Sequence, residues 1–306
     1  MVLGRIGLTG ATGMLGRHIS AALQVAGAHV VSVSRTQCNS TSSWDLAEWL
    51  TLDALDALFG NVQALVHSGA VIDPVISGRE DRMFDVNVRA CCNLAEWSVS
   101  RSIPLIFISS ASVYADPESG ALSEDAPIAG NHIGNFYGMT KIMAENILEC
   151  YRPSGLRLAV LRPSSLYGFG GPPNKVIYKF LNLAANGKAI NLTPPFDDSV
   201  DFLHAADLSR AVVDVLEGAC WEVLNIASGR PISIRELALA CVEVSGRGSV
   251  RMVDVDLCER PPTHRFILDT TAARDRLGWV STIGIEQGLK MVRDGKLVTG
   301  KNSLFK

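Results

Sequence analysis

The sequence lacks a strong excess of either charge and lacks any long apolar run. Its 28 Lys and Arg residues nearly balance 31 Asp and Glu residues, and the formal net charge is −3. That balance provides no basic field for a nucleic acid or an anionic membrane surface. No apolar run reaches the roughly 18 residues that cross a bilayer, and the N-terminal segment MVLGRIGLTG does not show the charged-then-apolar pattern of a leader peptide. We therefore expect a cytoplasmic protein with no nucleic-acid or membrane partner.

The sequence also lacks the cysteine and histidine patterns of disulfide-stapled or metal-binding proteins. Its 7 cysteines are scattered, odd in number and never spaced as CxxC, so neither a disulfide framework nor a zinc site is indicated. We expect free thiols in a reducing compartment. His67, His132 and His204 do not cluster with cysteines or carboxylates at ligand spacing. We therefore expect no metal site.

What the chain does have is a regular alternation of short apolar runs and helix-period segments. Continuous apolar runs are typical of strands that are covered on both faces, and strands that alternate with helices favour a parallel sheet with right-handed crossovers. The predicted fold class is α/β, a doubly wound Rossmann-type parallel sheet. Strands are expected at residues 5–8, 28–33, 63–67, 105–109 and 156–161, and helices at residues 15–26, 83–99 and 136–150.

The texture of the sequence changes at the breaker cluster GFGGPPN, residues 168–174. Later segments read as helices at 176–185 and 205–217 and as a strand at 221–227. The pattern SIRE from Ser233 is a capping box that begins a further helix. We predict two parts, a dinucleotide-binding domain and a smaller mixed substrate-binding lobe. The first comprises residues 1–168, to which 202–227 return, and the second comprises 169–201 and 228–306.

A glycine-rich segment, TGATGMLG at residues 9–16, joins the first predicted strand to the first predicted helix. Three glycines at this spacing allow a tight turn, a close approach of backbone to a pyrophosphate and close packing of helix on strand. The helix N-terminus then presents unpaired N–H groups to the phosphates. The position between a strand and a helix predicts a dinucleotide site. The expected contacts are Gly10, Thr12, Gly13, Met14, Leu15 and Gly16.

The residues at the end of the second predicted strand indicate which dinucleotide is bound. An acidic residue there would bind the ribose 2′-hydroxyl of NAD, but the chain has Ser34 and Arg35. Arg35 can pair with a 2′-phosphate, and Ser34 can donate a hydrogen bond. NADP is therefore favoured. NAD stays possible, because a solvated Arg35 that stacks on the adenine would permit either cofactor.

Tyr137 and Lys141 lie one turn apart on one face of a predicted helix. A tyrosine pKa is normally near 10, and a nearby ammonium and a nicotinamide charge lower it. The phenol can then exchange a proton with a substrate hydroxyl or carbonyl as a hydride moves. The spacing alone also fits a surface Tyr and Lys. The pair begins its helix just after the strand that ends at Ser110, however, and strand carboxyl ends are where an open α/β sheet presents its site.

Further motifs follow in a characteristic order. After TGATGMLG come Asp45-Leu46, VHSGA, Asn87-Val88, SSASVYA, YGMTK and LRPSSLYG, and then DFLHAADL and DRLGW, which ends at Trp279. In this combination the chain resembles the extended short-chain dehydrogenase/reductase family, the NAD-dependent epimerase/dehydratase family. That family includes nucleotide-sugar epimerases, dehydratases and 4-keto reductases. The resemblance implies an enzyme with a Rossmann-type fold.

The resemblance also implies cofactor contacts along one edge of the sheet. Asp45 and Leu46 would lie by the adenine. The residues that would line the cofactor after the fourth strand are Ser68, Gly69, Ala70 and Asn87. Arg162 and Pro163 would lie near the nicotinamide.

Catalytic roles are implied in the same way. In family motifs of the form SS-x-x-VYG, the catalytic hydroxyl lies four residues before the tyrosine. Here that tyrosine is Tyr114, which selects Ser110 over the two neighbouring serines. Ser110 would hydrogen-bond the substrate oxygen beside Tyr137, and Lys141 would also bind the nicotinamide ribose. The family further implies a homodimer in which helices 83–99 and 136–150 pair across the interface.

Departures from the family pattern bear on the substrate. The 4,6-dehydratases carry an Asp-Glu pair after the catalytic hydroxyl, where this chain has Ala111 and Ser112, which argues against dehydration. Nucleotide-sugar enzymes usually have Asn at the position of Ser165 and an arginine that clamps the diphosphate at the position of Val200. Substrate contacts are expected from Ser112, Ser165, Asn174 and Arg260.

The sequence thus predicts an NAD(P)-dependent enzyme acting at a carbonyl or hydroxyl carbon of a nucleotide-linked sugar. Two reactions compete, a 4-keto reductase that consumes NADPH and an epimerase that retains its cofactor, and Arg35 favours the first. A carbonyl reductase for a non-nucleotide substrate is an alternative, which the missing arginine at Val200 would allow. An NADP-sensing regulator on the same fold is more remote, because such proteins lose the Tyr–Lys pair that is present here.

Overall fold

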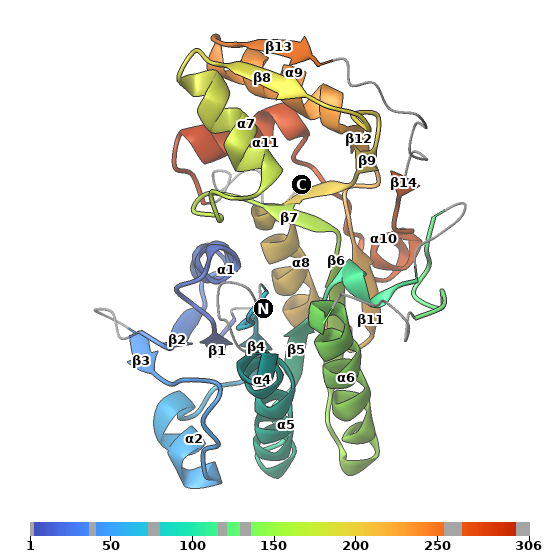
Figure 1. The fold of residues 1–306 in the computed structure, drawn as a ribbon. Helices are drawn as coiled ribbons and strands as arrows, with labels where there is room; N and C mark the ends of the chain where they lie inside the picture. The colour runs from blue at the N-terminus through green and yellow to red at the C-terminus, as the bar shows by residue number, and fades with distance from the viewer. Residues whose placement is uncertain are drawn as a thin grey trace.

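The computed structural model describes residues 3–36, 41–72, 80–115, 121–128, 136–253 and 265–297. At its centre lies a parallel sheet of seven strands (Figure 1). Its order is β11-β6-β5-β4-β1-β2-β3, so the chain starts in the middle and reverses direction between β1 and β4. This is the doubly wound Rossmann arrangement, and the predicted fold class is confirmed. The strands are β1 (Arg5–Thr9), β2 (His29–Ser34), β3 (Thr41–Ser43), β4 (Ala64–His67), β5 (Leu105–Ile108), β6 (Leu158–Pro163) and β11 (Val223–Ile226).

Helices cover both faces of the sheet, which explains why its central strands are largely apolar. In β5, Ile106 and Ile108 join the core cluster on one face, and Leu105 and Phe107 join the cluster on the other. On the first face lie α1 (Met14–Val25) and α8 (Ala205–Gly218), and on the second lie α2 (Leu52–Phe59), α5 (Ala90–Ser100) and α6 (Phe136–Cys150).

The helix predicted at 83–99 is interrupted. It begins as α4 (Glu80–Phe84), widens into a π-helical turn at Asp85–Arg89 and continues as α5. Single π turns frequently occur at functional sites. This one turns the buried Asn87 toward the loop after β4, where its amide pairs with both backbone groups of Val71 at 2.8 Å and donates to Thr140 Oγ1 at 3.0 Å. The π turn therefore ties the loop after β4 to helix α6.

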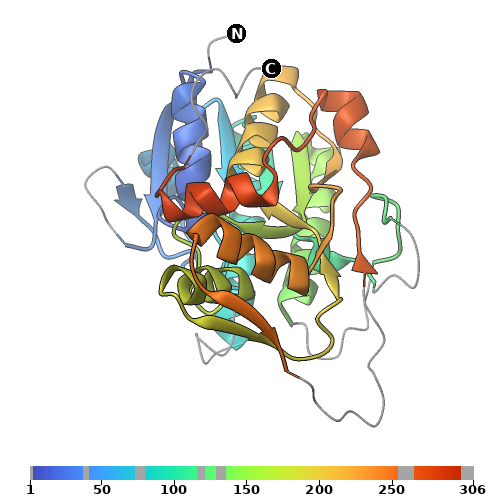
Figure 2. The ribbon, with the colours of Figure 1, turned by 90° about the horizontal axis from the view of Figure 1, so that it is seen from above.

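A smaller mixed lobe lies over the carboxyl edge of the sheet, and in Figure 2 its helices are seen from above. The capping box predicted at Ser233 is present, since the Glu236 N–H donates to Ser233 Oγ at 3.1 Å and the Ser233 N–H donates to the Glu236 carboxylate at 2.6 Å. The third core cluster joins three helices of this lobe. The lobe contains α7 (Val176–Ala185), β8 (Ala189–Leu192), β9 (Ser199–Val200), β12 (Ile232–Ser233), α9 (Ile234–Ser245), β13 (Ser249–Met252), β14 (Arg265–Phe266) and α11 (Ile285–Arg293).

Two further connections link the lobe to the sheet. A two-stranded parallel ribbon joins β7 (Ser165–Tyr167) to β10 (Phe202–His204) directly above the end of β6. Helix α10 (Thr271–Leu277) packs back on β11 and α8, and the buried Trp279 belongs to the same core cluster as α1. Short 3₁₀ turns occur at Ala111–Val113 and Arg152–Ser154. Within the described residues, no helix is both long and apolar enough to cross a membrane.

Candidate active site

The glycine loop after β1 is shaped so that only glycine fits at two positions. Gly10 has a φ of +69°, and a Cβ atom there would lie 2.6 Å from Gly69 Cα. A Cβ on Gly16 would collide with the carbonyl oxygen of Gly10. Helix α1 starts directly after Gly13. The backbone can therefore approach a diphosphate at the positive end of the helix, as the spacing predicted.

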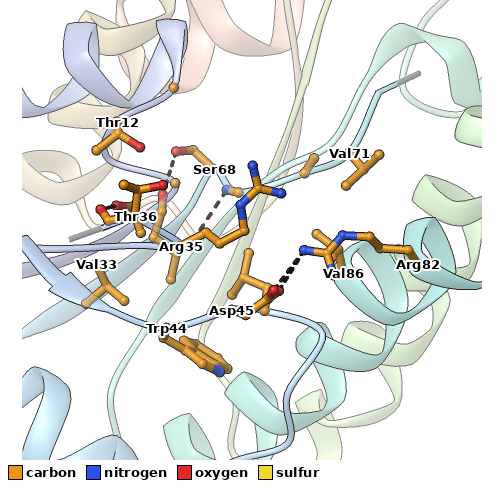
Figure 3. A pocket seen from close by; sticks show the side chains of 17 residues that line it. Thr12, Val33, Arg35, Thr36, Trp44, Asp45, Ser68, Val71, Arg82 and Val86 are labelled. Carbon is orange, nitrogen blue, oxygen red and sulfur yellow. Dashed lines mark hydrogen bonds and ion pairs between the residues drawn. The ribbon is translucent and has the colours of Figure 1, made fainter. Parts of the chain in front are cut away.

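Two adjoining cavities extend from this loop along the carboxyl edge of the sheet. One, of about 290 Å³, lies at the ends of β1 and β2 and beside the segment that follows β3, and its lining residues are drawn in Figure 3. The other, of about 760 Å³, lies between β5, β6 and the smaller lobe. Gly10, Gly13, Ser68 and Ala70 line both, so the cavities form one groove that turns at the glycine loop. Such a groove suits a dinucleotide whose two halves diverge from its diphosphate.

The smaller cavity collects the residues expected at the adenosine end, including Ser34, Arg35, Asp45 and Leu46. It also contains Arg82 of α4, which the sequence analysis did not single out. Arg82 Nη2 lies 2.8 Å from one carboxylate oxygen of Asp45 and 3.0 Å from the other. Partial burial raises the pKa of Asp45, but its bonds to Arg82 and the Ala47 N–H and the charge of Arg35 outweigh burial, and the pKa falls below its usual value. Asp45 is therefore a carboxylate at neutral pH.

The larger cavity collects the three predicted catalytic side chains. Ser110 follows β5, and its hydroxyl donates to Ser112 Oγ at 3.0 Å and hydrogen-bonds the phenol of Tyr137. Lys141 is buried, with its Nζ donating to the carbonyl of Ile108 at 2.8 Å and lying 5.8 Å from the centre of the Tyr137 ring. The end of β5 and the start of α6 thus bring a hydroxyl, a phenol and an ammonium to one wall.

Burial changes the acidity of two of these groups. It raises the pKa of Tyr137 to about 12, although the hydrogen bond with Ser110 acts in the opposite direction. It lowers the pKa of Lys141 to about 8, against the raising influence of Cys91 and Glu145. At neutral pH the phenol of Tyr137 therefore holds its proton. Lys141 is still charged there, but it loses its proton when the pH rises only slightly, through its pKa of about 8.

A buried ion pair supports this wall from behind. Arg162 forms three hydrogen bonds with the Glu145 carboxylate, the shortest at 2.7 Å, and both side chains are almost fully buried. Glu145 also accepts a hydrogen bond from Ser109, and Arg162 donates to Tyr114 at 2.9 Å. A buried carboxylate requires such a partner. Glu145 lies one turn beyond Lys141 on the same apolar helix face, a signal that the sequence analysis did not use.

Most of the predicted cofactor contacts lie along the groove, and two do not. The guanidinium of Arg162 is held by Glu145 and does not line the larger cavity, whereas the adjacent Pro163 does. Asn87 holds Val71 in place from behind the loop. The residues that line the groove are Gly10, Thr12, Gly13, Met14, Leu15, Gly16, Ser34, Arg35, Asp45, Leu46, Ser68, Gly69, Ala70, Tyr137, Lys141 and Pro163.

The substrate contacts are placed unevenly. Ser112 and Ser165 line the larger cavity, but Asn174 does not, and its neighbour Lys175 lines it instead. Val200, the position of the missing arginine, lines the same cavity. Arg260 lies outside the described residues. Sequence reasoning overlooked Lys175 because a lysine beside a Pro-Pro breaker is usually a solvated loop residue.

His67 and His204 make contacts within the fold. His67 is buried between the ring of Phe107 and the Thr9 hydroxyl, which lies 2.6 Å from its Nδ1. His204 accepts the Ala206 N–H at the start of α8, and His132 lies outside the described residues. Among the described residues there is no group of three or more His, Cys, Asp or Glu side chains that could hold a metal ion.

Comparison with known proteins agrees with this geometry. The chain is 26% identical to the dTDP-4-dehydro-6-deoxy-D-allose reductase of Streptomyces bikiniensis, over 78% of this chain and 81% of that protein. It is 26% identical to the UDP-glucose 4-epimerase of Azospirillum brasilense, over 90% and 87%. A 4,6-dehydratase is also among the relatives.

Solved structures give the same result. The structure of MoeE5 in complex with UDP-glucose and NAD superposes with a TM-score of 0.79 at 25% identity, over 95% of this chain and 98% of that one. Residues 6–227 match the family model described as "NAD dependent epimerase/dehydratase family". The match covers the whole glycine loop, all of the sheet except Arg5, and the wall that carries Ser110, Tyr137 and Lys141. This chain therefore belongs to the NAD-dependent epimerase/dehydratase family.

Proposed function

We propose that this protein is an NADPH-dependent reductase acting on the keto carbon of a nucleotide-linked sugar. The observation that carries the proposal is the convergence of Ser110, Tyr137 and Lys141 on one wall of the 760 Å³ cavity. The groove continues into an adenosine end that contains Arg35. The family supports the substrate class, since relatives are named for reactions of UDP- and dTDP-linked sugars.

The catalytic wall is suited to protonating a carbonyl oxygen. When bound, the nicotinamide supplies the hydride. Ser110 would hold the substrate oxygen by a hydrogen bond beside the phenol to which it is already bonded. Tyr137, whose pKa of about 12 keeps it protonated, would give its proton to that oxygen as the carbon is reduced. The ammonium of Lys141 would stabilise the phenolate that is left.

Lys175 supports a nucleotide-linked substrate. It lines the same cavity as Val200, where it can supply a positive charge that the missing family arginine would otherwise give. A diphosphate binds well to such a charge. Dehydration is disfavoured, because Ala111 and Ser112 offer no carboxyl group for acid–base work on a leaving water.

Epimerisation is the second candidate, and the likeness to a UDP-glucose 4-epimerase over 90% of this chain favours it. An epimerase must oxidise and then reduce the same carbon, and so keeps its cofactor between the two half-reactions. A reductase must exchange its cofactor in every turnover. The two candidates therefore differ in how the protein holds the dinucleotide.

The first experiment is to purify the protein without added cofactor, denature it, and identify and quantify the released nucleotide. We expect an empty protein that binds NADPH reversibly and then reduces a member of a panel of 4-keto sugar nucleotides. Near-stoichiometric NAD or NADP in the purified protein would instead establish the epimerase. Turnover of simple ketones with none of the sugar nucleotides would point to the non-nucleotide carbonyl reductase.

A further inference from the structure

The adenosine end of the groove contains an ion pair that crosses between distant parts of the chain. Asp45 follows β3 and Arg82 lies on α4, and Figure 3 shows the two side chains meeting at the rim of the cavity. Each is 27% exposed, so the pair is partly shielded from water. The guanidinium of Arg35 extends from the end of β2 over the same cavity. Arg35, Asp45 and Arg82 are the charged residues among those that line it.

The geometry determines which arginine is available to a ligand. A single nitrogen of Arg82, Nη2, contacts both carboxylate oxygens of Asp45, which is a charge-assisted hydrogen bond shared between the two oxygens. Arg35 is close enough to influence the charge of Asp45, yet no carboxylate within the described residues forms an ion pair with it. Asp45 is the carboxylate among the residues that line this cavity with Arg35, and without Arg82 it would be left to neutralise Arg35. With Arg82 present, the lining keeps one positive charge in excess.

We propose that Arg82 is a cofactor-selectivity residue, which engages Asp45 and thereby leaves Arg35 free to bind the 2′-phosphate of NADP. This inference rests on the proposed use of NADPH. It assigns the preference of the protein for NADPH over NADH partly to a residue that does not lie at the end of strand β2. Arg82 acts through Asp45, so it is a positioning residue for the charge of Arg35. NAD has no phosphate at that position, and its binding should depend little on the pair.

The test is calorimetric titration of the cofactor-free protein with NADPH and NADH, for the intact chain and for R82M, D45N and R82M/D45N. In R82M the freed Asp45 neutralises Arg35, and we expect NADPH to bind about tenfold more weakly or worse. NADH affinity should change by less than about threefold, which also shows that the variant is folded. In the double variant Asp45 has lost its charge, and most of the NADPH affinity should return.

That recovery separates charge balance from a merely structural role. If R82M binds NADPH as the intact chain does, or if R82M/D45N remains as weak as R82M, the role of Arg82 is overturned. R89M is the matched control. Arg89 forms an ion pair with Asp85, four residues earlier in the chain, and does not line the cavity. A separate result, intact protein that prefers NADH, would overturn the proposed NADPH preference itself.

Discussion

At the scale of single residues, the site depends on how burial changes proton affinity. Tyr137 and Lys141 have pKa values displaced in opposite directions, to about 12 and about 8, because burial penalises the charged form of each. The phenol is thereby kept as a proton donor, and the pKa of the Lys141 ammonium lies close to neutral pH. Separated proton affinities of this kind are typical of paired groups in catalysis.

Replacing Tyr137 with Phe removes the proton donor and nearly nothing else. We expect kcat to fall by about 10²–10⁴-fold, the usual contribution of a positioned acid, while the Kd of NADPH changes little. Steady-state kinetics and titration of cofactor measure the two quantities. Tyr151→Phe, just beyond the far end of the same helix, is the control and should be fully active. Full activity in Tyr137→Phe would remove this residue from the mechanism.

The charge of Lys141 should be visible in the pH profile. Burial lowers its pKa to about 8, so the ammonium is present below that pH and is lost as the pH rises through it. We expect kcat/KM to decline above about pH 8. Glu145 raises the pKa of Lys141, so Glu145→Gln should move the decline to lower pH. Lys141→Arg keeps its charge throughout, and any residual activity should lack this decline. An identical decline in Lys141→Arg would contradict the assignment.

At the scale of elements, the wall that carries Ser110, Tyr137 and Lys141 is held in place by a buried polar network. The Glu145–Arg162 pair connects α6 to β6, and Tyr114 extends the network to Asn225 of β11 through a hydrogen bond of 2.6 Å. Buried charges are costly unless they are paired, so each partner requires the other. The network therefore fixes the position of α6, and with it Tyr137 and Lys141, relative to the sheet.

Arg162→Met should destabilise the fold by about 3–5 kcal/mol, because it leaves the Glu145 carboxylate buried without a cation. The double variant Arg162→Met/Glu145→Met should lose less than the single one. Urea unfolding followed by circular dichroism gives the free energies. Arg101→Met is the control, since the exposed Arg101–Asp56 pair should contribute only a small stabilisation. A loss of that small size in Arg162→Met would show that the network does not stabilise the wall.

At the scale of the whole molecule, the smaller lobe completes the groove that the sheet begins. The larger cavity is lined on one side by β5, β6 and α6 and on the other by Gly170, Pro172, Lys175 and Val200. The lobe therefore places side chains opposite the catalytic wall. The division of the chain at residues 168, 201 and 227 stays a prediction, and α10 packs against the sheet rather than the lobe core.

Lys175 provides a test of how the lobe selects substrate. If it binds the diphosphate of a nucleotide sugar, Lys175→Met should raise KM about tenfold and leave both kcat and the Kd of NADPH nearly unchanged. Lys179→Met, one turn later on α7 and outside this cavity, is the matched control. Kinetics with the nucleotide sugar and with the free sugar would separate the two substrate classes. An unchanged KM in Lys175→Met would weaken the nucleotide-linked assignment.

Local sequence determined the elements and motifs of the Rossmann part. Apolar runs predicted six of the seven strands of the central sheet within a few residues, and the sixth of these is the strand 221–227, which is β11. These runs are apolar because both faces of the strands are covered. Glycine spacing predicted the loop around Gly10, where no other side chain fits. Strand β3 and helix α2 were missed, the first because it has only three residues, Thr41–Ser43, which are polar.

Contacts between distant segments were decided only by the tertiary structure. Arg82 reaches Asp45 across 37 positions in the chain, and Arg162 turns to Glu145 rather than to the cavity. The sequence marks neither, since an ion pair depends on where two elements meet and on how much water is excluded there. The glycines of a phosphate loop are visible in the sequence, because the local backbone geometry itself requires glycine at two of these positions. The partner of a charge is set by the packing of helices and strands that the fold brings together.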